Sequence, residues 1–258
     1  MKTSLFKILL LIFSYCSILL ISSCGKDDGM GFGDNNGPGK GGSLARFIIV
    51  GQYMYVVDNA TLKTFSLANP QQPKLENSTQ IGFNIETIYA FDNNLFIGSR
   101  DAMYIYNLQN PSQPTYKSTS SHIRACDPVV AQDNFAYVTV RSGNNGSPCG
   151  GNTNMLMVYD VSDISNPILL NEVALSNPHG LGIHNNILYV CDGKNGLRIL
   201  DVTDKKNIKF INTLTTAHEY QDVIIDDNYL FCMLPNGFVI YDISNPQELP
   251  VKIAEMLN

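Results

Sequence analysis

Residues 197–204 read LRILDVTD, an apolar run that ends in a polar turn, and the chain repeats this pattern. Four similar runs begin at Leu62, Met103, Met155 and Phe238. The aliphatic residue that closes each run marks a period, with spacings of 41, 53, 41 and 41 residues. These matched residues are Leu67, Leu108, Val161, Val202 and Ile243. A period of this length indicates an array of similar structural units.

Each unit contains three further apolar runs, so we expect four antiparallel strands per unit. A second run carries a matched aromatic residue at Tyr55, Phe96, Tyr137, Tyr189 or Phe231. A shorter run precedes it and ends in a turn of the residue types that favour hairpins. Four strands in about 41 residues are typical of a propeller blade. The sequence predicts an all-β fold, a five-bladed β-propeller, with blades at about 45–82, 83–122, 123–176, 177–216 and 217–258.

Some inner runs are apolar at consecutive positions, as in Phe47 to Val50 and Val223 to Ile225. A strand with one wet face alternates, whereas a blade between two others loses water on both faces. We therefore expect the inner strands to be buried on both faces. No strand from the amino terminus completes the last blade, so closure of the ring stays open between face-to-face packing and a partner chain.

The amino terminus resembles the signal peptide of a bacterial lipoprotein. Two lysines precede an apolar stretch from Ile8 to Ile21, which is shorter than the roughly 20 residues that span a bilayer. It ends in ISSC, which resembles a lipobox, where cleavage precedes a lipidated Cys. The resemblance implies a signal peptide over residues 1–23 and a lipid on Cys24. The alternative is an ordinary secretory peptide with a chance Cys.

Residues 24–44 are rich in glycine and lack apolar periodicity, so we expect a flexible tether after the lipidated Cys. Their start, Gly25 to Asp28, resembles a short signal that directs lipoproteins of one Gram-negative phylum to the outside of the outer membrane. The alternative is the polar start of the tether. We expect a lipid-anchored protein of the bacterial outer membrane, exposed at the cell surface.

Three of the repeated runs, 156–161, 197–202 and 238–243, resemble the core of the LVIVD repeat. That repeat occurs in bacterial surface propeller proteins. The resemblance covers residues 44–258 and is clearest in the last three repeats, because Ser66 and Asn107 replace the repeat's Asp in the first two. It implies a surface β-propeller and carries no shared catalytic activity.

The repeat's acidic residue stands at Asp160, Asp201 and Asp242, each just before a Ser or Thr. A short carboxylate there can accept backbone N–H groups of the turn. We favour this turn-stabilising role over a metal site, because no second oxygen-rich cluster follows at calcium-loop spacing.

Four cysteines remain after Cys16 leaves with the signal peptide and Cys24 carries lipid. Cys126 precedes the innermost strand of blade 3, and Cys149 lies in an insertion of the same blade. Both positions open onto one face of a propeller, so a disulfide between them is sterically plausible, contributing roughly 3 kcal/mol. Cys191 and Cys232 fall inside strands and are interpreted as buried free thiols.

Polar residues share one repeat position at the start of the innermost strands, and they predict a cluster at the mouth of the central channel. They are Glu86, Asp127, His179 and Gln221. Asp127 and His179 belong to adjacent blades, so an Asp oriented against a His could act as a general base or contribute to a metal site. The alternative is an ordinary polar, hydrated channel.

The insertion of about twelve residues between Ser142 and Asn154 breaks the period. Its candidate binding residues are Asn144, Asn145 and Asn152, since scaffolds place binding groups on such loops. The alternative is a neutral surface insertion, because long loops cost little extra entropy.

The composition limits the class of partner. Lys and Arg number 17 against 23 Asp and Glu, and loss of residues 1–23 leaves a net charge of −8. Nucleic acid is therefore a poor partner. No catalytic or metal motif stands out, so we expect no cofactor and no metal. The leading hypothesis is an envelope-anchored binding module for a polysaccharide, peptide or envelope protein. The alternative is a surface hydrolase or lyase with Asp127 and His179 at the channel mouth.

Overall fold

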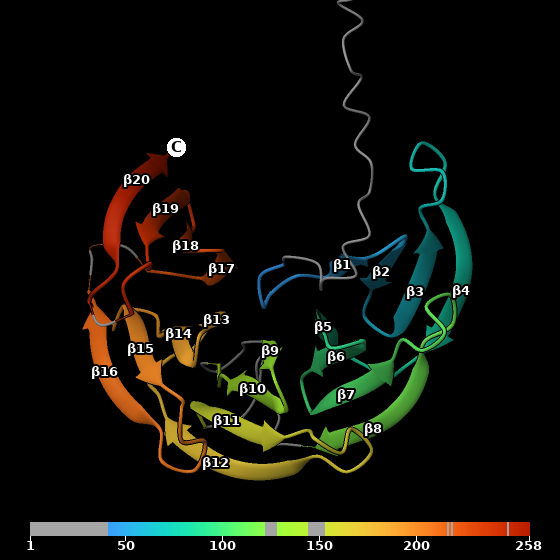
Figure 1. The fold of residues 1–258 in the computed structure, drawn as a ribbon, viewed down its shortest axis with the longest axis horizontal. Coiled ribbons are helices and arrows are strands. Elements are labelled where there is room, and N and C mark those ends of the chain that lie inside the picture. Colours follow the sequence, from blue (N-terminus) through green and yellow to red (C-terminus); the bar gives the residue numbers. More distant parts are fainter. Residues whose placement is uncertain (1–40, 122–127, 144–152, 216, 218, 247) are drawn as a thin grey trace, which may run out of the picture. The chain divides into compact units, whose positions relative to one another are not determined.

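The computed structural model describes residues 41–121, 128–143, 153–215, 217, 219–246 and 248–258. In these residues the chain forms twenty β-strands in five four-stranded antiparallel sheets, and each sheet takes its strands in chain order. All twenty belong to one compact unit. The sheets stand side by side around a common centre, with the first strand of each innermost (Figure 1). The predicted fold class, a five-bladed β-propeller, is confirmed.

The bounds of the strands follow the repeat. Blade 1 comprises β1 (Phe47–Val50), β2 (Tyr53–Val57), β3 (Thr61–Ser66) and β4 (Lys74–Gln80). Blade 2 comprises β5 (Ile85–Phe91), β6 (Asn94–Ser99), β7 (Ala102–Asn107) and β8 (Thr115–Ser121). Blade 3 comprises β9 (Val129–Gln132), β10 (Phe135–Val140), β11 (Met155–Asp160) and β12 (Ile168–Ala174). Blade 4 comprises β13 (Leu181–His184), β14 (Ile187–Cys191), β15 (Leu197–Asp201) and β16 (Lys209–Leu214). Blade 5 comprises β17 (Asp222–Asp226), β18 (Tyr229–Leu234), β19 (Gly237–Asp242) and β20 (Val251–Leu257).

The turns between first and second strands use left-handed backbone conformations, as their Asp and Asn residues predict. Asp92 and Asn93 have φ values of 44° and 60°, and Asn185 and Asn186 have 49° and 62°. Asn and Asp tolerate this region better than other residues with a Cβ, and two successive positive φ values match the twist of a hairpin. The chain therefore reverses within the two residues that connect each inner strand to the second strand of its blade.

The fourth strand of every blade pairs through a β-bulge at the same place. The register shifts at Thr64/Phe65, Ile105/Tyr106, Val158/Tyr159, Ile199/Leu200 and Ile240/Tyr241. A bulge bends its strand and increases the local twist. The first two blades thus share this geometry even though their turn residues are Ser66 and Asn107.

Hydrophobic clusters fill the boundaries between successive blades. The cluster between blades 1 and 2 includes Tyr55, Leu62 and Ile88, all fully buried. Similar clusters lie between blades 2 and 3, blades 3 and 4, and blades 4 and 5. Burial of apolar area on this scale is the main stabilising contribution to the fold.

The prediction that the inner strands lose water on both faces is wrong for blade 1. Ile48 is 3% exposed, but Phe47 and Ile49 on the other face of β1 are 58% and 40% exposed. Figure 1 shows the reason, because the ring is open between blade 5 and blade 1. Inner strands pack against each other at the other four boundaries, and β17 does not pack against β1 to the same extent.

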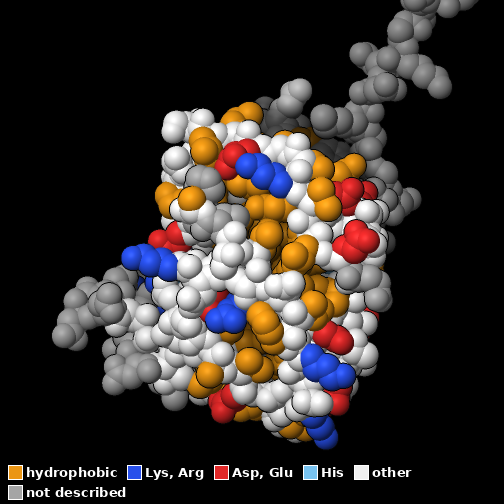
Figure 2. Space-filling view, turned by 90° about the vertical axis from the view of Figure 1, so that its left-hand side faces the viewer, with side chains coloured by type: hydrophobic (Ala, Val, Ile, Leu, Met, Phe, Trp, Pro, Cys, Tyr) orange, Lys and Arg blue, Asp and Glu red, His pale blue; other side chains and the backbone are white. Residues whose placement is uncertain are grey.

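The outer strands also leave apolar side chains in water. Figure 2 shows hydrophobic side chains gathered in a band on the side of the molecule where β16 and β20 lie. Exposed members on these two strands include Phe210, Ile211, Val251, Ile253 and Met256.

A polar contact joins the start of blade 1 to blades 4 and 5. Ser43 Oγ donates a hydrogen bond to Asp222 Oδ1 at 2.9 Å, and the N–H of Leu44 donates to Asp222 Oδ2 at 3.2 Å. The N–H of Leu181 in turn donates to Ser43 Oγ at 2.8 Å. We call Ser43, Leu44, Leu181 and Asp222 the closure contact. It bridges the open side of the ring by hydrogen bonds rather than by packed blade faces.

The carboxyl group of Asp222 is almost enclosed, with 8% of the residue exposed. Burial raises the pKa of Asp222 from 3.8 to about 6, although the hydrogen bonds of Ser43 and Leu44 lower it. Gly180 is required beside it, because a Cβ on Gly180 would lie 2.0 Å from Asp222 Oδ1 and 2.7 Å from its Cα. The close approach of blades 4 and 5 at this point therefore excludes a side chain.

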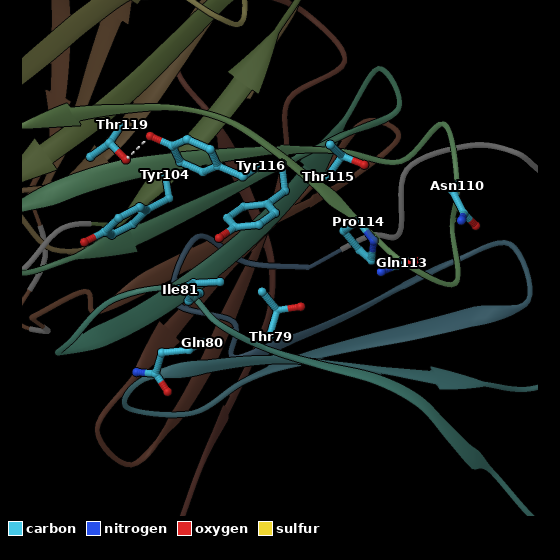
Figure 3. A pocket seen from close by; sticks show the side chains of 11 residues that line it. Thr79, Gln80, Ile81, Tyr104, Asn110, Gln113, Pro114, Thr115, Tyr116 and Thr119 are labelled. Atoms are coloured by element: carbon cyan, nitrogen blue, oxygen red, sulfur yellow. Dashed lines mark hydrogen bonds between the residues drawn. The ribbon is translucent and has the colours of Figure 1, made fainter.

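An open groove of about 780 Å³ lies between the outer strands of blades 1 and 2 (Figure 3). Its walls come from the end of β4, from β7 and β8, and from the turn between these two strands.

We predict that Asp222 makes the stability of the propeller depend on pH. Its folded pKa of about 6 lies above 3.8, so its proton stabilises the folded state below about pH 4, and this contribution of about 3 kcal/mol is lost as pH rises through 6. Asp222→Asn keeps one of the two acceptor oxygens and does not ionise. Melting curves between about pH 4.5 and 7.5 should show the advantage of the wild type over Asp222→Asn shrinking as pH rises. A difference that stays constant over this range would contradict the prediction.

We predict opposite effects for two matched tyrosines. Tyr55 Oη donates a hydrogen bond to the Pro111 carbonyl at 2.8 Å, linking blade 1 to the turn of blade 2. Tyr137 Oη is buried and has no hydrogen-bond partner among the described residues. Tyr55→Phe should lower the free energy of unfolding by about 1 kcal/mol, whereas Tyr137→Phe should leave it unchanged or raise it. Urea unfolding of both variants measures this, and equal losses would refute it.

Candidate functional site

At one face of the propeller, the inner strand of each blade begins and its second strand turns into its third. We call this face the upper face. The antiparallel order of each blade places both kinds of segment there. Three predicted site residues of the described chain, Glu86, His179 and Gln221, stand at matching positions. In each blade, the matched aromatic residue of the second strand pairs with a residue of the inner strand, and the predicted site residue lies three positions before that inner-strand residue.

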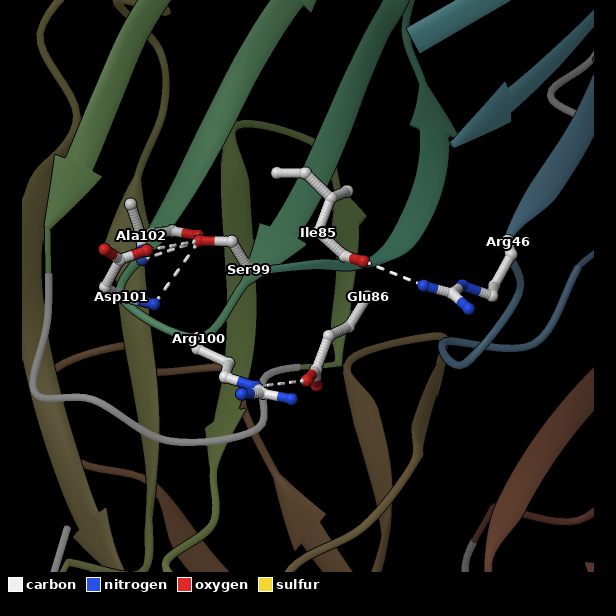
Figure 4. Close-up of polar contacts among 7 residues, drawn as sticks. All are labelled: Arg46, Ile85, Glu86, Ser99, Arg100, Asp101 and Ala102. Carbon is white, nitrogen blue, oxygen red and sulfur yellow. Dashed lines mark hydrogen bonds and ion pairs between the residues drawn. The ribbon is translucent and has the colours of Figure 1, made fainter. Parts of the chain in front are cut away.

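Glu86 is held by an arginine of its own blade. Arg100 Nε donates to Glu86 Oε1 at 3.0 Å, and both side chains are partly exposed. Glu86 is the extra residue of a β-bulge in β5, which turns it out of the ladder. Arg46, from the start of blade 1, donates from Nη2 to the carbonyl oxygen of Ile85 at 2.9 Å (Figure 4). Two guanidinium groups therefore flank the start of β5.

His179 is fixed by its backbone and its ring. Its N–H donates to the carbonyl of Cys191 at 2.7 Å, and its own carbonyl accepts from Thr139 Oγ1 at 2.7 Å. Its Nε2 lies 3.2 Å from the side-chain nitrogen of Asn177. Burial lowers the pKa of His179, and nearby Arg141 lowers it further. The ring is therefore neutral at neutral pH and serves as a hydrogen-bonding group rather than a cation.

Gln221 has an exposed side chain, and both its backbone N–H and its carbonyl form hydrogen bonds. Its N–H donates to Met233 at 2.9 Å, and its carbonyl accepts from Gly180 at 2.8 Å. Its neighbour Asp222 is the buried group of the closure contact. The buried polar side chain of this blade is thus Asp222, one residue after the position that the sequence pattern indicates.

Several predicted site residues lie outside the described residues and stay predictions. They are Cys24, Cys126, Asp127, Asn144, Asn145, Cys149 and Asn152. The proposed disulfide and the pairing of an Asp with His179 are therefore untested.

The ends of the blade 3 insertion are described, and a side chain joins them. Asn154 Oδ1 accepts hydrogen bonds from the N–H of Ser142 at 2.8 Å and from Ser142 Oγ at 3.0 Å. Asn154 Nδ2 donates to the carbonyl of Ser176 at 2.6 Å. The base of the insertion is thereby closed and attached to the connection between blades 3 and 4.

Sequence reasoning missed four arginines among the described residues of the upper face, namely Arg46, Arg100, Arg141 and Arg198. Arg198 Nε binds Asp192 Oδ2 at 3.1 Å, and the Asp192 side chain is 0% exposed. Arg141 is partly buried and makes no hydrogen bond or ion pair with a described residue. Burial lowers the pKa of Arg141, while Glu86 and Glu219 raise it. Their positions in the sequence could have identified them, because each of these arginines lies at or next to a strand end on the upper face.

Buried thiols and metal ligands offer no alternative centre in the described chain. Cys191 and Cys232 are buried free cysteines, as predicted, and burial raises the pKa of both thiols. Raised pKa values keep thiols protonated and unreactive. The described residues contain no group of three or more His, Cys, Asp or Glu that could hold a metal ion. They also contain no helix with the length and hydrophobicity needed to cross a membrane.

The repeat's acidic residues cap turns, as predicted. Oδ1 of Asp160, Asp201 and Asp242 accepts the N–H two residues ahead at 2.8–2.9 Å. The side-chain and backbone hydrogen bonds of the following Ser or Thr lower the pKa of all three carboxyls. In the first two blades the same bond is made by Ser66, at 3.3 Å, and by Asn107, at 2.9 Å. The position needs an acceptor and does not need a charge.

The radial sheets and the repeated turn define the chain as a β-propeller. The LVIVD repeat matches residues 150–174, 179–216 and 219–253. The chain is therefore a five-bladed β-propeller with LVIVD repeats, and the repeat matches its last three blades.

Solved structures share the fold at low sequence identity. A functionally unknown protein from Desulfotomaculum acetoxidans has a TM-score of 0.66 at 10% identity, over 80% of this chain and 67% of that one. The Pseudomonas aeruginosa periplasmic gluconolactonase PpgL has a TM-score of 0.63 at 10% identity, over 80% and 68%. The computationally designed Ika8 protein has a TM-score of 0.57 at 10% identity, over 81% and 60%. The chain thus spans about two thirds or less of these proteins, and the likeness concerns the fold alone. No curated protein matches the sequence.

We predict that Asp201 acts through its acceptor oxygen. Asp201→Ala should lower the free energy of unfolding by about 1 kcal/mol, because the N–H of Thr203 loses its partner. Asp201→Asn should retain most of the stability, since Asn107 makes this bond in blade 2. Urea unfolding with and without EDTA checks both statements. An equal loss in the two variants, or a loss on adding EDTA, would instead indicate a charge or metal requirement.

Proposed function

We propose that this chain is an envelope-anchored lipoprotein whose propeller is a non-enzymatic binding module. Its binding surface is the upper face, and its ligand is an acidic group on a polysaccharide or an envelope protein. The single observation that carries the proposal is the uneven pairing of the arginines on this face.

Of the upper-face residues that the structure describes, two arginines are neutralised and two have spare capacity. Arg100 binds Glu86 and Arg198 binds Asp192. Among the described residues, Arg46 binds one carbonyl oxygen and Arg141 has no partner. A guanidinium group presents five donors in a planar fork that matches a carboxylate. In the described part of the chain, neither Arg46 nor Arg141 forms an ion pair that an acidic ligand would have to break, although Glu86 and Glu219 act on Arg141 electrostatically.

The neutral ring of His179 suits the same role. Its imidazole lies close enough to Arg141 for the guanidinium to lower its pKa. A neutral imidazole adds a hydrogen-bonding group beside the Arg141 guanidinium, and it does not repel that guanidinium as a charged imidazolium would. The two together offer one ligand a charged contact and an uncharged one.

The amino-terminal sequence supports the anchor. A lipidated Cys24 would hold the protein on a membrane, since buried acyl chains contribute about 0.8 kcal/mol per methylene and more than one chain is needed for stable anchoring. The Gly-rich residues 24–44 would let the propeller reach ligands away from the bilayer.

The test uses the full mature chain and two acidic probes, hexagalacturonate and hexaglutamate. The variant is Arg46→Gln with Arg141→Gln, and the matched control is Lys206→Gln with Lys209→Gln, two exposed lysines on blade 4 away from the upper face. Calorimetry should show at least one probe binding and a loss of about tenfold or more in the arginine variant, equal to about 1.4 kcal/mol. The lysine variant should stay within about twofold of the wild type, and salt should weaken binding.

Two results would overturn the proposal. One is a failure of both acidic probes to bind the wild type. The other is an equal loss in the lysine variant, which would mean that net charge rather than the upper face attracts the ligand. Preference for hexagalacturonate over hexaglutamate identifies the ligand as an acidic polysaccharide, and the reverse identifies a protein.

A further inference from the structure

The groove between blades 1 and 2 has a chemistry unlike that of the upper face. It holds about 780 Å³ and is lined by three tyrosines and by the amides of Gln80, Asn110 and Gln113, together with threonines. No Asp, Glu, Lys or Arg lines it. Its volume lies within the range of about 300–1,000 Å³ that is usual for small-ligand sites.

The tyrosines form one wall because of their register. Tyr106 pairs with Tyr116 and Tyr104 pairs with Thr119 across β7 and β8, so these side chains share the sheet face that is directed toward blade 1. Tyr116 is 53% exposed, and its hydroxyl lies 3.0 Å from Thr119 Oγ1. The ring of buried Tyr106 meets the ring of Tyr116 edge to face, with centroids 5.7 Å apart. The edge-to-face contact holds the Tyr116 ring in place, while about half of this side chain stays exposed.

Gly82 lets Tyr104 lie along the edge of the groove. A Cβ on Gly82 would approach Tyr104 Oη to 2.6 Å. The Tyr104 hydroxyl therefore passes so close to the backbone at Gly82 that a larger residue there would clash with it.

The exposed phenol of Tyr116 and the half-buried phenol of Tyr104 distinguish this groove from the other outer surfaces. The shared bulge fixes the residues equivalent to Tyr104 and Tyr116 in every blade. The corresponding pairs are Lys63 and Leu75 in blade 1, Met157 and Leu169 in blade 3, Arg198 and Phe210 in blade 4, and Val239 and Lys252 in blade 5. Blade 2 alone combines two tyrosines there, so the wall is a property of this blade and not of the repeat.

We propose that this groove binds a neutral oligosaccharide segment. A sugar ring presents a face of C–H groups that packs on an aromatic ring, and its hydroxyls need donors and acceptors around that ring. Tyr116 and Tyr104 supply the aromatic faces, and the amides of Gln80, Asn110 and Gln113 supply both donors and acceptors. The lack of charged lining residues favours an uncharged ligand over an acidic one. The site is separate from the upper-face arginines and does not depend on them.

The test again uses the full mature chain, with maltohexaose, cellohexaose and xylohexaose as probes. Tyrosine emission reports binding, because the chain has 13 Tyr and no Trp, and calorimetry gives the dissociation constant. At least one probe should bind with a dissociation constant of about 1 mM or less. Tyr116→Ala and Gln80→Ala should each weaken that binding, the first by about tenfold or more.

The matched control is Leu169→Ala, because Leu169 is 43% exposed and occupies the position of Tyr116 in blade 3. It should leave binding unchanged. Tyr116→Leu keeps apolar surface at the site and should lose binding as Tyr116→Ala does, with an unaltered melting temperature. Failure of all three probes, or an equal loss in Leu169→Ala, would overturn the inference.

The two proposed sites can fail separately. The Arg46→Gln, Arg141→Gln variant should bind the neutral probe as the wild type does. Tyr116→Ala should bind hexagalacturonate as the wild type does. Loss of hexagalacturonate binding in Tyr116→Ala would contradict the assignment of the groove to neutral sugars.

Discussion

Every four-stranded blade has two apolar faces, and most of the molecule follows from the need to cover both. A single blade cannot bury these faces by itself, so the sheets stack around a centre and each shares a hydrophobic cluster with its neighbour. The shared bulge and the acceptor at the end of the third strand keep successive blades alike, which lets the same packing repeat. Side chains on the rims of the blades are free of this demand and can vary, and the arginines and the tyrosine groove lie there.

The same demand explains why the two ends of the array are unlike the middle. Blade 1 has no blade packed on the face that carries Phe47 and Ile49, and these residues remain exposed. The protein joins its ends with the closure contact, a few hydrogen bonds to one buried carboxyl group. Such a contact holds a smaller area than a packed boundary, and its strength changes with the protonation of Asp222.

The repeat architecture was predictable because it depends on local rules. Alternating runs, Asp and Asn at positive φ, and an acceptor before each outer turn can all be recognised in the sequence, and they held even where Ser66 and Asn107 replace Asp. The exposure of Phe47 was not predictable, because it depends on what packs beyond the blade. The role of Arg46 was missed for a similar reason, since its partner Ile85 belongs to the next blade. Gln221 was placed correctly along the chain, but its neighbour Asp222 takes the buried position, because its carboxyl meets Ser43 from a distant part of the chain.

The closure contact also lies where the propeller meets the segment before blade 1. Ser43 and Leu44 connect residues 1–42 to β1, and both bind Asp222. Mechanical force applied through the preceding chain therefore reaches these hydrogen bonds before it reaches the ladder of blade 1. These hydrogen bonds lie outside the ladders of blade 1, so their loss breaks no pairing between its strands.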